Sequence, residues 1–277
     1  MHRVRQPRGF IHAHLAGGVA AAIITAALAG GGLTVMALTQ SERPAAAVLP
    51  VADATVPDGV RRAVAAVVAV RQPGGSASGV SLDERTVITA GHAAVKGGAV
   101  ACNGLMTVAT TGVEPVTSAA VRYGDGTDAA LLFREPVNRT TVGIATGTAR
   151  RGDTVYFANW QNRADGAARK TPALFSGTVL GKADGGYLLA VRNDAGYDLP
   201  SDGLLRRGGS GGAVFDTDGR LLGVSVSVDA LSATHSAGQL RRNHGVRLPA
   251  GWYQVTKAQA VDARLVTSLR AVAQPCR

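Results

Sequence analysis

The segment Arg206–Val214 (RRGGSGGAV) places one serine, Ser210, among four glycines and leads into an apolar run. Glycine allows sharp turns and a close approach of the backbone to a bound molecule, because it has no side chain. A serine nucleophile needs such a backbone, and it needs N–H donors aimed at the oxygen that becomes negative during attack on a carbonyl. A flexible glycine linker or a plain tight loop explains the segment equally well, so its meaning depends on a base and an orienting acid elsewhere.

Two other segments supply candidates for the base and the acid. His92 lies in the segment Thr89–Ala94 (TAGHAA), which follows an apolar stretch typical of a strand. Asp128 lies directly before the apolar run Ala129–Phe133 (AALLF), and Asp125 is a competing acid three residues earlier. Asp128 is favoured because the strand begins immediately after it.

In this order the three segments resemble the His, Asp and Ser motifs of trypsin-like serine proteases of the chymotrypsin fold, most closely those of bacterial members. The resemblance covers roughly residues 60–270. It implies that Ser210 is the nucleophile, that His92 is the general base and acid, and that Asp128 orients the imidazole. By the same resemblance, the N–H groups of Gly208 and Ser210 form the oxyanion hole. No cofactor is implied, and His and Cys do not cluster at metal-ligand spacing.

The sequence departs from the family pattern at three places. Gly209 precedes the nucleophile where animal digestive relatives have an aspartate, so activation through an ion pair with a newly cleaved N-terminus is not expected. Leu204 occupies the position of the pocket floor, which argues against cleavage after Lys or Arg, although Asp202 lies two residues further back. Val226 and Val228 replace Ser and Gly and would favour small apolar residues, whereas Arg207 at the pocket mouth would favour an acidic one. Both preferences remain open.

Short apolar or alternating runs, separated by turn residues, predict an all-β fold. The resemblance specifies two six-stranded antiparallel β-barrels with the active site between them. In that arrangement His92 and Asp128 belong to the first barrel and Ser210 to the second. The predicted strands are Val64–Val70, Ala77–Leu82, Thr86–Thr89, Val116–Tyr123, Ala129–Phe133, Thr154–Ala158, Ala173–Leu180, Tyr187–Val191, Gly212–Phe215 and Leu221–Val228.

A C-terminal helix is predicted over Lys257–Val272. Within this segment Val261, Leu265 and Leu269 recur four residues apart, with arginines off that face. The family has a helix at the same place, and we interpret this one as a packing helix.

The N-terminus predicts a membrane segment. Residues 1–14 form a basic tail, and residues 15–38 contain no charged residue over a length that suits a membrane-spanning helix. A long cleavable signal peptide is the alternative, with Val35–Ala37 as a cleavage context. Residues 39–57 have the composition of a linker, and residues 58–277 form the predicted protease domain. The positive-inside rule places that domain outside the cytoplasm, anchored to the cell membrane or secreted.

Composition limits the remaining possibilities. Hydrophobic residues make up 46% and charged residues 17% of the chain, which fits a packed core. The net charge is +10, but the basic pairs are scattered and not interleaved with aromatic residues, so nucleic-acid binding is not expected. Cys102 and Cys276 could form one disulfide in an oxidising compartment. The sequence does not indicate an oligomeric state.

The sequence therefore predicts an extracytoplasmic serine endopeptidase whose partner is a protein or peptide substrate. Gly208, Ser210 and Gly212 also have the spacing of an esterase nucleophile elbow, but His92 precedes the serine, which is the wrong order for that fold. A protease-fold binding protein without activity is the other alternative.

Overall fold

The computed structural model describes residues 56–72, 75–96, 99–100, 107–110, 113–117, 120–123, 127–134, 136, 139–160, 171–192, 208–227 and 235–271. The predicted membrane segment 15–38, Cys102 and Cys276 lie outside these ranges. Among the helices within them, none has the length and apolar character needed to cross a membrane.

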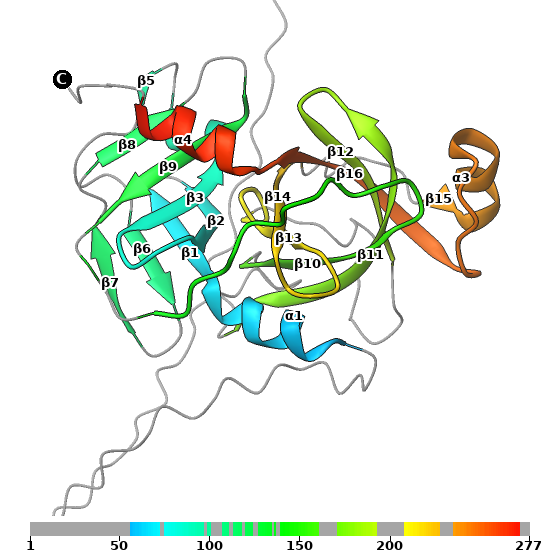
Figure 1. The fold of residues 1–277 in the computed structure, drawn as a ribbon, viewed down its shortest axis with the longest axis horizontal. Helices are drawn as coiled ribbons and strands as arrows, with labels where there is room; N and C mark the ends of the chain where they lie inside the picture. The colour runs from blue at the N-terminus through cyan, green and yellow to red at the C-terminus, as the bar shows by residue number, and fades with distance from the viewer. Residues whose placement is uncertain are drawn as a thin grey trace, which may run out of the picture. The chain divides into compact units, whose positions relative to one another are not determined.

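The first half of the described chain forms an antiparallel sheet of seven strands in the order β7-β6-β1-β2-β3-β9-β8 (Figure 1). Its strands are β1 (Val67–Gln72), β2 (Gly75–Ser81), β3 (Thr86–Ala90), β6 (Thr107–Thr110), β7 (Val113–Thr117), β8 (Ala120–Tyr123) and β9 (Ala129–Phe133). A small pair, β4 (Val95–Lys96) and β5 (Ala99–Val100), follows β3 in the chain.

This sheet differs from the predicted first barrel. The run Val116–Tyr123, expected to be one strand, is divided between β7 and β8, which lie at opposite edges of the sheet. No pairing joins these two edges within the described ranges, so the prediction of a closed six-stranded barrel is wrong for this half. Pro115 in β7 has no N–H to donate, and a strand that contains proline suits an edge position.

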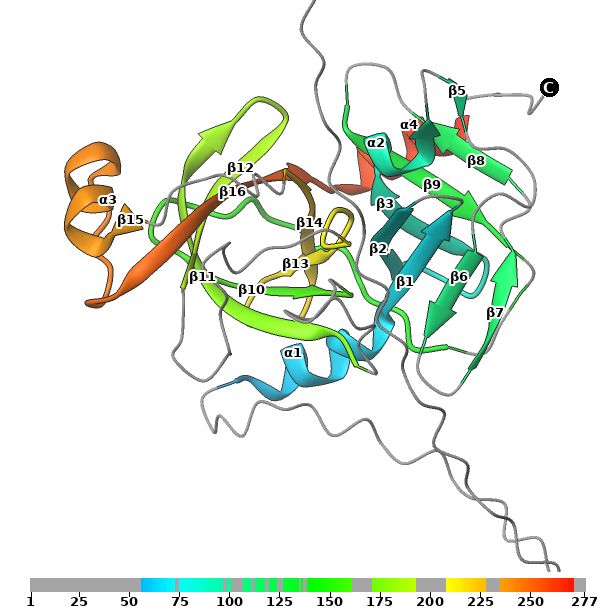
Figure 2. The same cartoon turned by 180° about the vertical axis from the view of Figure 1, so that it is seen from behind.

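The second half forms a closed six-stranded barrel, as predicted. The order is β12-β11-β10-β13-β14-β16, and pairing of β12 with β16 closes it; β15 adds to the outside of β16 (Figure 2). The strands are β10 (Thr154–Asn159), β11 (Ala173–Ala183), β12 (Gly186–Arg192), β13 (Ala213–Phe215), β14 (Leu221–Ser227), β15 (His235–Ser236) and β16 (Trp252–Ala260).

The largest core cluster contains residues from both halves. Ile88 and Leu131 of the first sheet belong to the same buried cluster as Phe215 and Val224 of the barrel. The strand β9 is buried on both faces: Ala129 and Leu131 face this shared core, whereas Ala130 and Leu132 face the core of the first sheet. The two halves are therefore joined by apolar packing on one face of β9, the strand that follows Asp128.

Each chain end of the described region packs against the other half. The helix α1 (Asp58–Ala63) precedes the first sheet but contacts the β13–β14 hairpin so closely that a side chain at Gly59 would meet the carbonyl of Asp218. The helix α4 (Ala263–Ala271) follows the barrel, packs against β8 and β9 of the first sheet (Figures 1 and 2), and places Leu269 in the shared core.

The C-terminal helix is shorter than predicted. Lys257–Ala260 belongs to β16, where it pairs with β12 and β14, and the helix begins only after Asp262. The Asp262 side chain accepts a hydrogen bond from the N–H of Leu265 at 2.7 Å, which caps the first turn. The run Val64–Val70 was also predicted as a strand throughout, but Val64–Ala66 forms a short 3₁₀ helix, η1, before β1.

Three of the described helices were not predicted: α1, α2 (Gly91–Ala94) and α3 (Ala237–His244). The helix α3 lies beside β15 and β16 and covers Tyr253 with Leu240. It begins with a capping box: Gln239 N–H donates to the Ser236 hydroxyl, and the Gln239 side chain accepts from the Ser236 N–H. The Ser-x-x-Gln spacing is a helix-start signal visible in the sequence.

Candidate active site

His92 sits on the first short helix after β3. The helix α2 (Gly91–Ala94) follows the buried strand β3 directly, so the strand fixes the position of the His92 main chain. Its flanking residues Gly91 and Ala93 are buried, whereas 48% of the His92 side chain is exposed. The main chain around His92 is therefore held by buried neighbours, whereas the imidazole ring is accessible to an approaching molecule.

Asp128 lies against His92. The imidazole Nδ1 is 2.9 Å from Asp128 Oδ2 and 3.2 Å from Oδ1, and the His92 main-chain N–H donates to Oδ1 at 2.7 Å. An ionised carboxylate only accepts hydrogen bonds, so Nδ1 carries the proton in this contact. The second ring nitrogen, Nε2, is then left as a proton acceptor.

The pKa of Asp128 lies below its ordinary value. Burial by itself raises the pKa, but hydrogen bonds from the His92 side chain and from the main-chain N–H groups of His92 and Gly91, together with the charge of His92, outweigh it. The carboxylate therefore stays ionised throughout the neutral range and can stabilise a protonated imidazole beside it.

Gln259, in β16 of the barrel, bonds to the main chain of Asp128. Its Oε1 accepts a hydrogen bond from the Asp128 main-chain N–H at 3.3 Å, and its Nε2 donates to the carbonyl of Gly185 at 2.6 Å. Gln259 is only 8% exposed. A residue of the second half thus contributes to the position of the acid in the first half.

The loop of residues 208–212, the Ser210 loop, packs against the first sheet. Gly211 has φ of 80°, and a side chain there would collide with the carbonyl of Ser78 and the hydroxyl of Thr89. Its N–H donates to the carbonyl of Ser225 at 2.6 Å, and the N–H of Gly212 donates to the carbonyl of Gly209 at 2.9 Å. Glycine is required at position 211 both for the backbone conformation and for the close approach.

Ser78 of β2 makes the contacts between this loop and the first sheet. Its N–H donates to the carbonyl of Ser210 at 2.7 Å, and its hydroxyl donates to the carbonyl of Gly208 at 2.7 Å. The same hydroxyl accepts from the N–H of Trp160 at 2.8 Å. Ser78 was not among the predicted site residues, because it belongs to none of the three motifs.

The structure thus brings two parts of the predicted site to the same sheet. His92 and Asp128 are in direct contact, and the Ser210 loop is bonded to β2, the neighbour of the strand that leads to His92. Of the predicted substrate pocket, only Val226 is described; it is half-buried and packs against both the shared core and the core of the first sheet. Leu204, Arg207 and Val228 lie outside the described residues, as does the competing acid Asp125.

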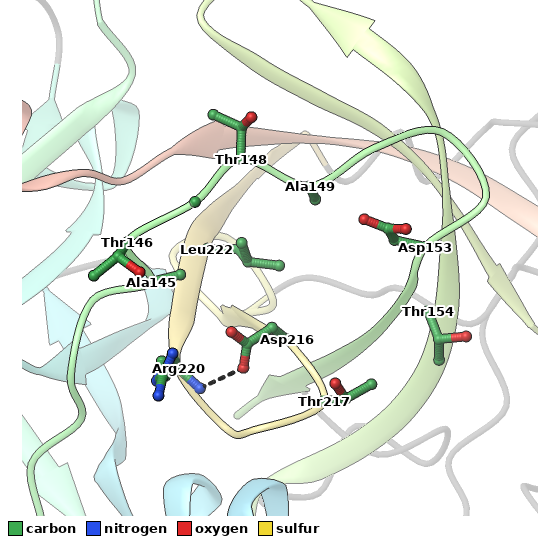
Figure 3. Close-up of a pocket in the computed structure, with 11 residues that line it drawn as sticks. Ala145, Thr146, Thr148, Ala149, Asp153, Thr154, Asp216, Thr217, Arg220 and Leu222 are labelled. Atoms are coloured by element: carbon green, nitrogen blue, oxygen red, sulfur yellow. Dashed lines mark hydrogen bonds between the residues drawn. The ribbon is translucent and has the colours of Figure 1, made fainter.

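A pocket of about 440 Å³ lies elsewhere, between the 145–149 segment, the start of β10 and the β13–β14 hairpin (Figure 3). It contains none of the predicted catalytic residues. Its acids are used in local turns: Asp153 accepts from the N–H of Arg150 at 2.7 Å, and Asp216 accepts from the N–H of Arg220 at 2.8 Å (dashed in Figure 3). We therefore do not place the chemistry there.

Chemically, the arrangement can take up a proton and stabilise the resulting charge. The exposed imidazole has an ionised partner on one side, and the loop that carries Ser210 is bonded to β2, a neighbouring strand of the same sheet. Over the described ranges, no group of three or more His, Cys, Asp or Glu side chains could hold a metal ion.

Comparison with known proteins points to one family. Residues 77–224 match the family model described as a trypsin-like peptidase domain. This range contains His92, Asp128 and Ser210. No curated protein matches the sequence significantly.

Solved structures show the same fold. The protease Rv3671c of M. tuberculosis in its inactive form is similar at a TM-score of 0.51 and 16% identity, over 78% of this chain and 92% of that one. Its active form gives 0.50 and 17%, over 80% and 87%. A serine endoprotease of Yersinia pestis gives 0.51 and 20%, over 76% of this chain and 64% of its own length.

Proposed function

The chain belongs to the trypsin-like peptidase family, and on this premise we propose that it is an extracytoplasmic serine endopeptidase that acts through Ser210, His92 and Asp128. The observation that carries the proposal is the bond between His92 Nδ1 and Asp128 Oδ2 at 2.9 Å, at the ends of two neighbouring strands of the sheet against which the Ser210 loop packs. Such a bond selects the tautomer in which Nε2 can accept a proton from a nucleophile.

In the proposed mechanism, Ser210 Oγ attacks the carbonyl carbon of the scissile peptide bond while His92 Nε2 takes the hydroxyl proton. The N–H groups of Gly208 and Ser210 donate to the oxygen that becomes negative. Asp128 stabilises the imidazolium, which then gives the proton to the leaving amine. Water attacks the acyl-enzyme in the second half of the reaction and releases the second product, with His92 again acting as base.

The proposed domain order places residues 15–38 in the membrane and the protease domain, residues 58–277, outside the cytoplasm; secretion after cleavage of the N-terminal segment is the alternative. Fractionation of cells that express the full chain tests this proposal. We expect the chain in the membrane fraction and accessible to an external protease, or processed and released. Unprocessed chain recovered from the cytosol would contradict it.

Cleavage of a peptide library by the purified full chain tests the activity. We expect internal cleavage that is lost in Ser210→Ala, with small apolar and acidic residues before the cut as the two preferences to compare. A folded parent that cleaves no peptide would favour the alternative of a silent protease-fold binding protein. Cleavage of ester substrates but of no peptide would contradict the endopeptidase assignment.

A further inference from the structure

Ser78 contacts both residues whose N–H groups form the proposed oxyanion hole. Its main-chain N–H donates to the carbonyl of Ser210, and its hydroxyl donates to the carbonyl of Gly208, each at 2.7 Å. We propose that Ser78 is a positioning residue that holds the oxyanion hole in its working geometry from the opposite half of the molecule. This inference rests on the proposed function.

The loop needs such a residue because it cannot anchor itself through side chains. Gly208 and Gly209 have none, and Gly208 has φ of 95°, a conformation that other residues rarely adopt. Each N–H shares a peptide plane with the carbonyl of the residue before it, so the Ser210 N–H lies in the Gly209–Ser210 plane, which the bond from the Gly212 N–H to the Gly209 carbonyl holds. The two bonds from Ser78 fix the planes on either side of that one: the Gly208–Gly209 plane, which lies between the two donors, and the plane that follows the nucleophile.

The direction of the Ser78 hydroxyl is itself determined. Its oxygen accepts from the N–H of Trp160 at 2.8 Å, which leaves its proton to point at the carbonyl of Gly208. Ser78 is fully buried, so water does not compete for these bonds. A chain of two hydrogen bonds in a buried site strengthens both members.

Ser78 also connects the Ser210 loop to β3, the strand that leads to His92. The hydroxyl of Thr89, in β3, donates to the carbonyl of Ser78 at 2.6 Å. Thr89 precedes His92 by three residues. Ser78 therefore lies between the base and the nucleophile, bonded to the segments that carry each of them.

Loss of the Ser78 hydroxyl should destabilise the transition state more than it weakens substrate binding. Without it, the carbonyl of Gly208 and the N–H of Trp160 are left without this buried partner, and the Gly208–Gly209 peptide plane, which sets how the two donors lie relative to each other, is free to turn. A displaced donor weakens a bond that reaches full strength only when the oxyanion forms.

The chain contains a matched control for this change. Ser81 lies on the same strand and is fully buried. Its hydroxyl has no hydrogen-bond partner among the described residues, so Ser81→Ala removes the same atom without removing such a contact.

The test compares the full-length parent with Ser78→Ala and Ser81→Ala. For Ser78→Ala we expect kcat to fall about 10- to 100-fold and KM to change less than about threefold, since a missing oxyanion donor itself costs about 100- to 1,000-fold. A peptide boronate, which mimics the tetrahedral intermediate, should bind more weakly by the same factor as the loss in kcat/KM. The control Ser81→Ala should stay within about twofold of the parent. An unchanged kcat in folded Ser78→Ala would overturn the proposal.

Two further measurements keep the outcome clear. Ser78→Thr retains the hydroxyl and should recover most of the lost kcat; a folded Ser78→Thr that is as slow as folded Ser78→Ala would show that loss of the hydroxyl is not the cause. Amide hydrogen exchange of residues 208–212, measured without substrate, should be faster in Ser78→Ala than in the parent and in Ser81→Ala. Faster exchange in a chain whose parent cleaves nothing would reject the protease function and retain the positioning role. Unchanged exchange would reject the positioning role alone.

Discussion

The His92–Asp128 pair and the Ser210 loop are held in place in different ways. The pair is fixed mainly by its own contacts, because the carboxylate accepts from both the side chain and the main chain of His92. The loop has almost no side chains and is fixed from outside, by Ser78 of the first sheet and by the main chain of Ser225. The difference shows that the proposed reacting groups can be found in sequence motifs, whereas the residues bonded to them need not belong to any motif.

Asp128→Asn should give the largest effect on the self-contained pair. The amide cannot stabilise a protonated imidazole and leaves His92 free to adopt the wrong tautomer. We expect kcat to fall by roughly 10⁴-fold with the fold intact, as measured by steady-state cleavage and circular dichroism. A loss of less than tenfold in a folded variant would show that Asp128 is not the orienting acid.

Gly211→Ala should damage the loop by a different route. The new methyl group would meet the carbonyl of Ser78 and the hydroxyl of Thr89, in a backbone conformation with φ of 80°. We expect a loss of activity of about 100-fold or more and a lower unfolding midpoint. Gly147→Ala is the control, because no atom lies within 4 Å of the position its methyl group would take. Equal behaviour of the two variants would mean that the loop does not pack as described.

Gln259→Met tests the support that the barrel gives to Asp128. The methionine fills a similar volume but cannot accept from the Asp128 N–H or donate to Gly185. We expect kcat/KM to fall about tenfold and the free energy of unfolding to fall by about 1–2 kcal/mol. Gln239→Met, which removes half of the α3 capping box, should cost similar stability and no activity. Full activity in Gln259→Met would show that Asp128 needs no support from the second half.

The smallest expected effect concerns pH. Because the pKa of Asp128 is lowered in the folded chain, its ionised form stabilises the fold above the ordinary pKa of about 3.9, and this contribution is lost as the pH falls through the lowered value. The stability advantage of the parent over Asp128→Asn should therefore shrink below about pH 4. Chemical unfolding of both proteins between neutral and acidic pH measures it. A stability advantage of the parent that grows on acidification would contradict a lowered pKa of Asp128.

The motifs predicted the members of the pair because the chemistry restricts the residue types. The strand β9 begins and ends where the sequence predicted it, since its five apolar residues are buried or nearly so and Asp128 marks its start. The contact between His92 and Asp128, 36 residues apart, followed from the family resemblance and could not be read from spacing alone.

Other features depend on tertiary pairing and were beyond sequence reasoning. The segment Lys257–Ala260 fits the spacing of a helix, but pairing with β12 and β14 makes it a strand. Closure of the first barrel was expected by analogy, and the described strands do not show it. Ser78 and Gln259 act through backbone groups of residues more than 70 positions away, to which no sequence pattern points.

The most direct test of the account is covalent labelling of the full chain with a fluorophosphonate probe, with the labelled residue located by mass spectrometry. An activated serine reacts with such a probe, whereas an ordinary serine hydroxyl does not. The account predicts one label, on Ser210, that is absent from Ser210→Ala and forms much more slowly in Asp128→Asn. A folded parent that takes up no label, or takes it up at another residue, would contradict it.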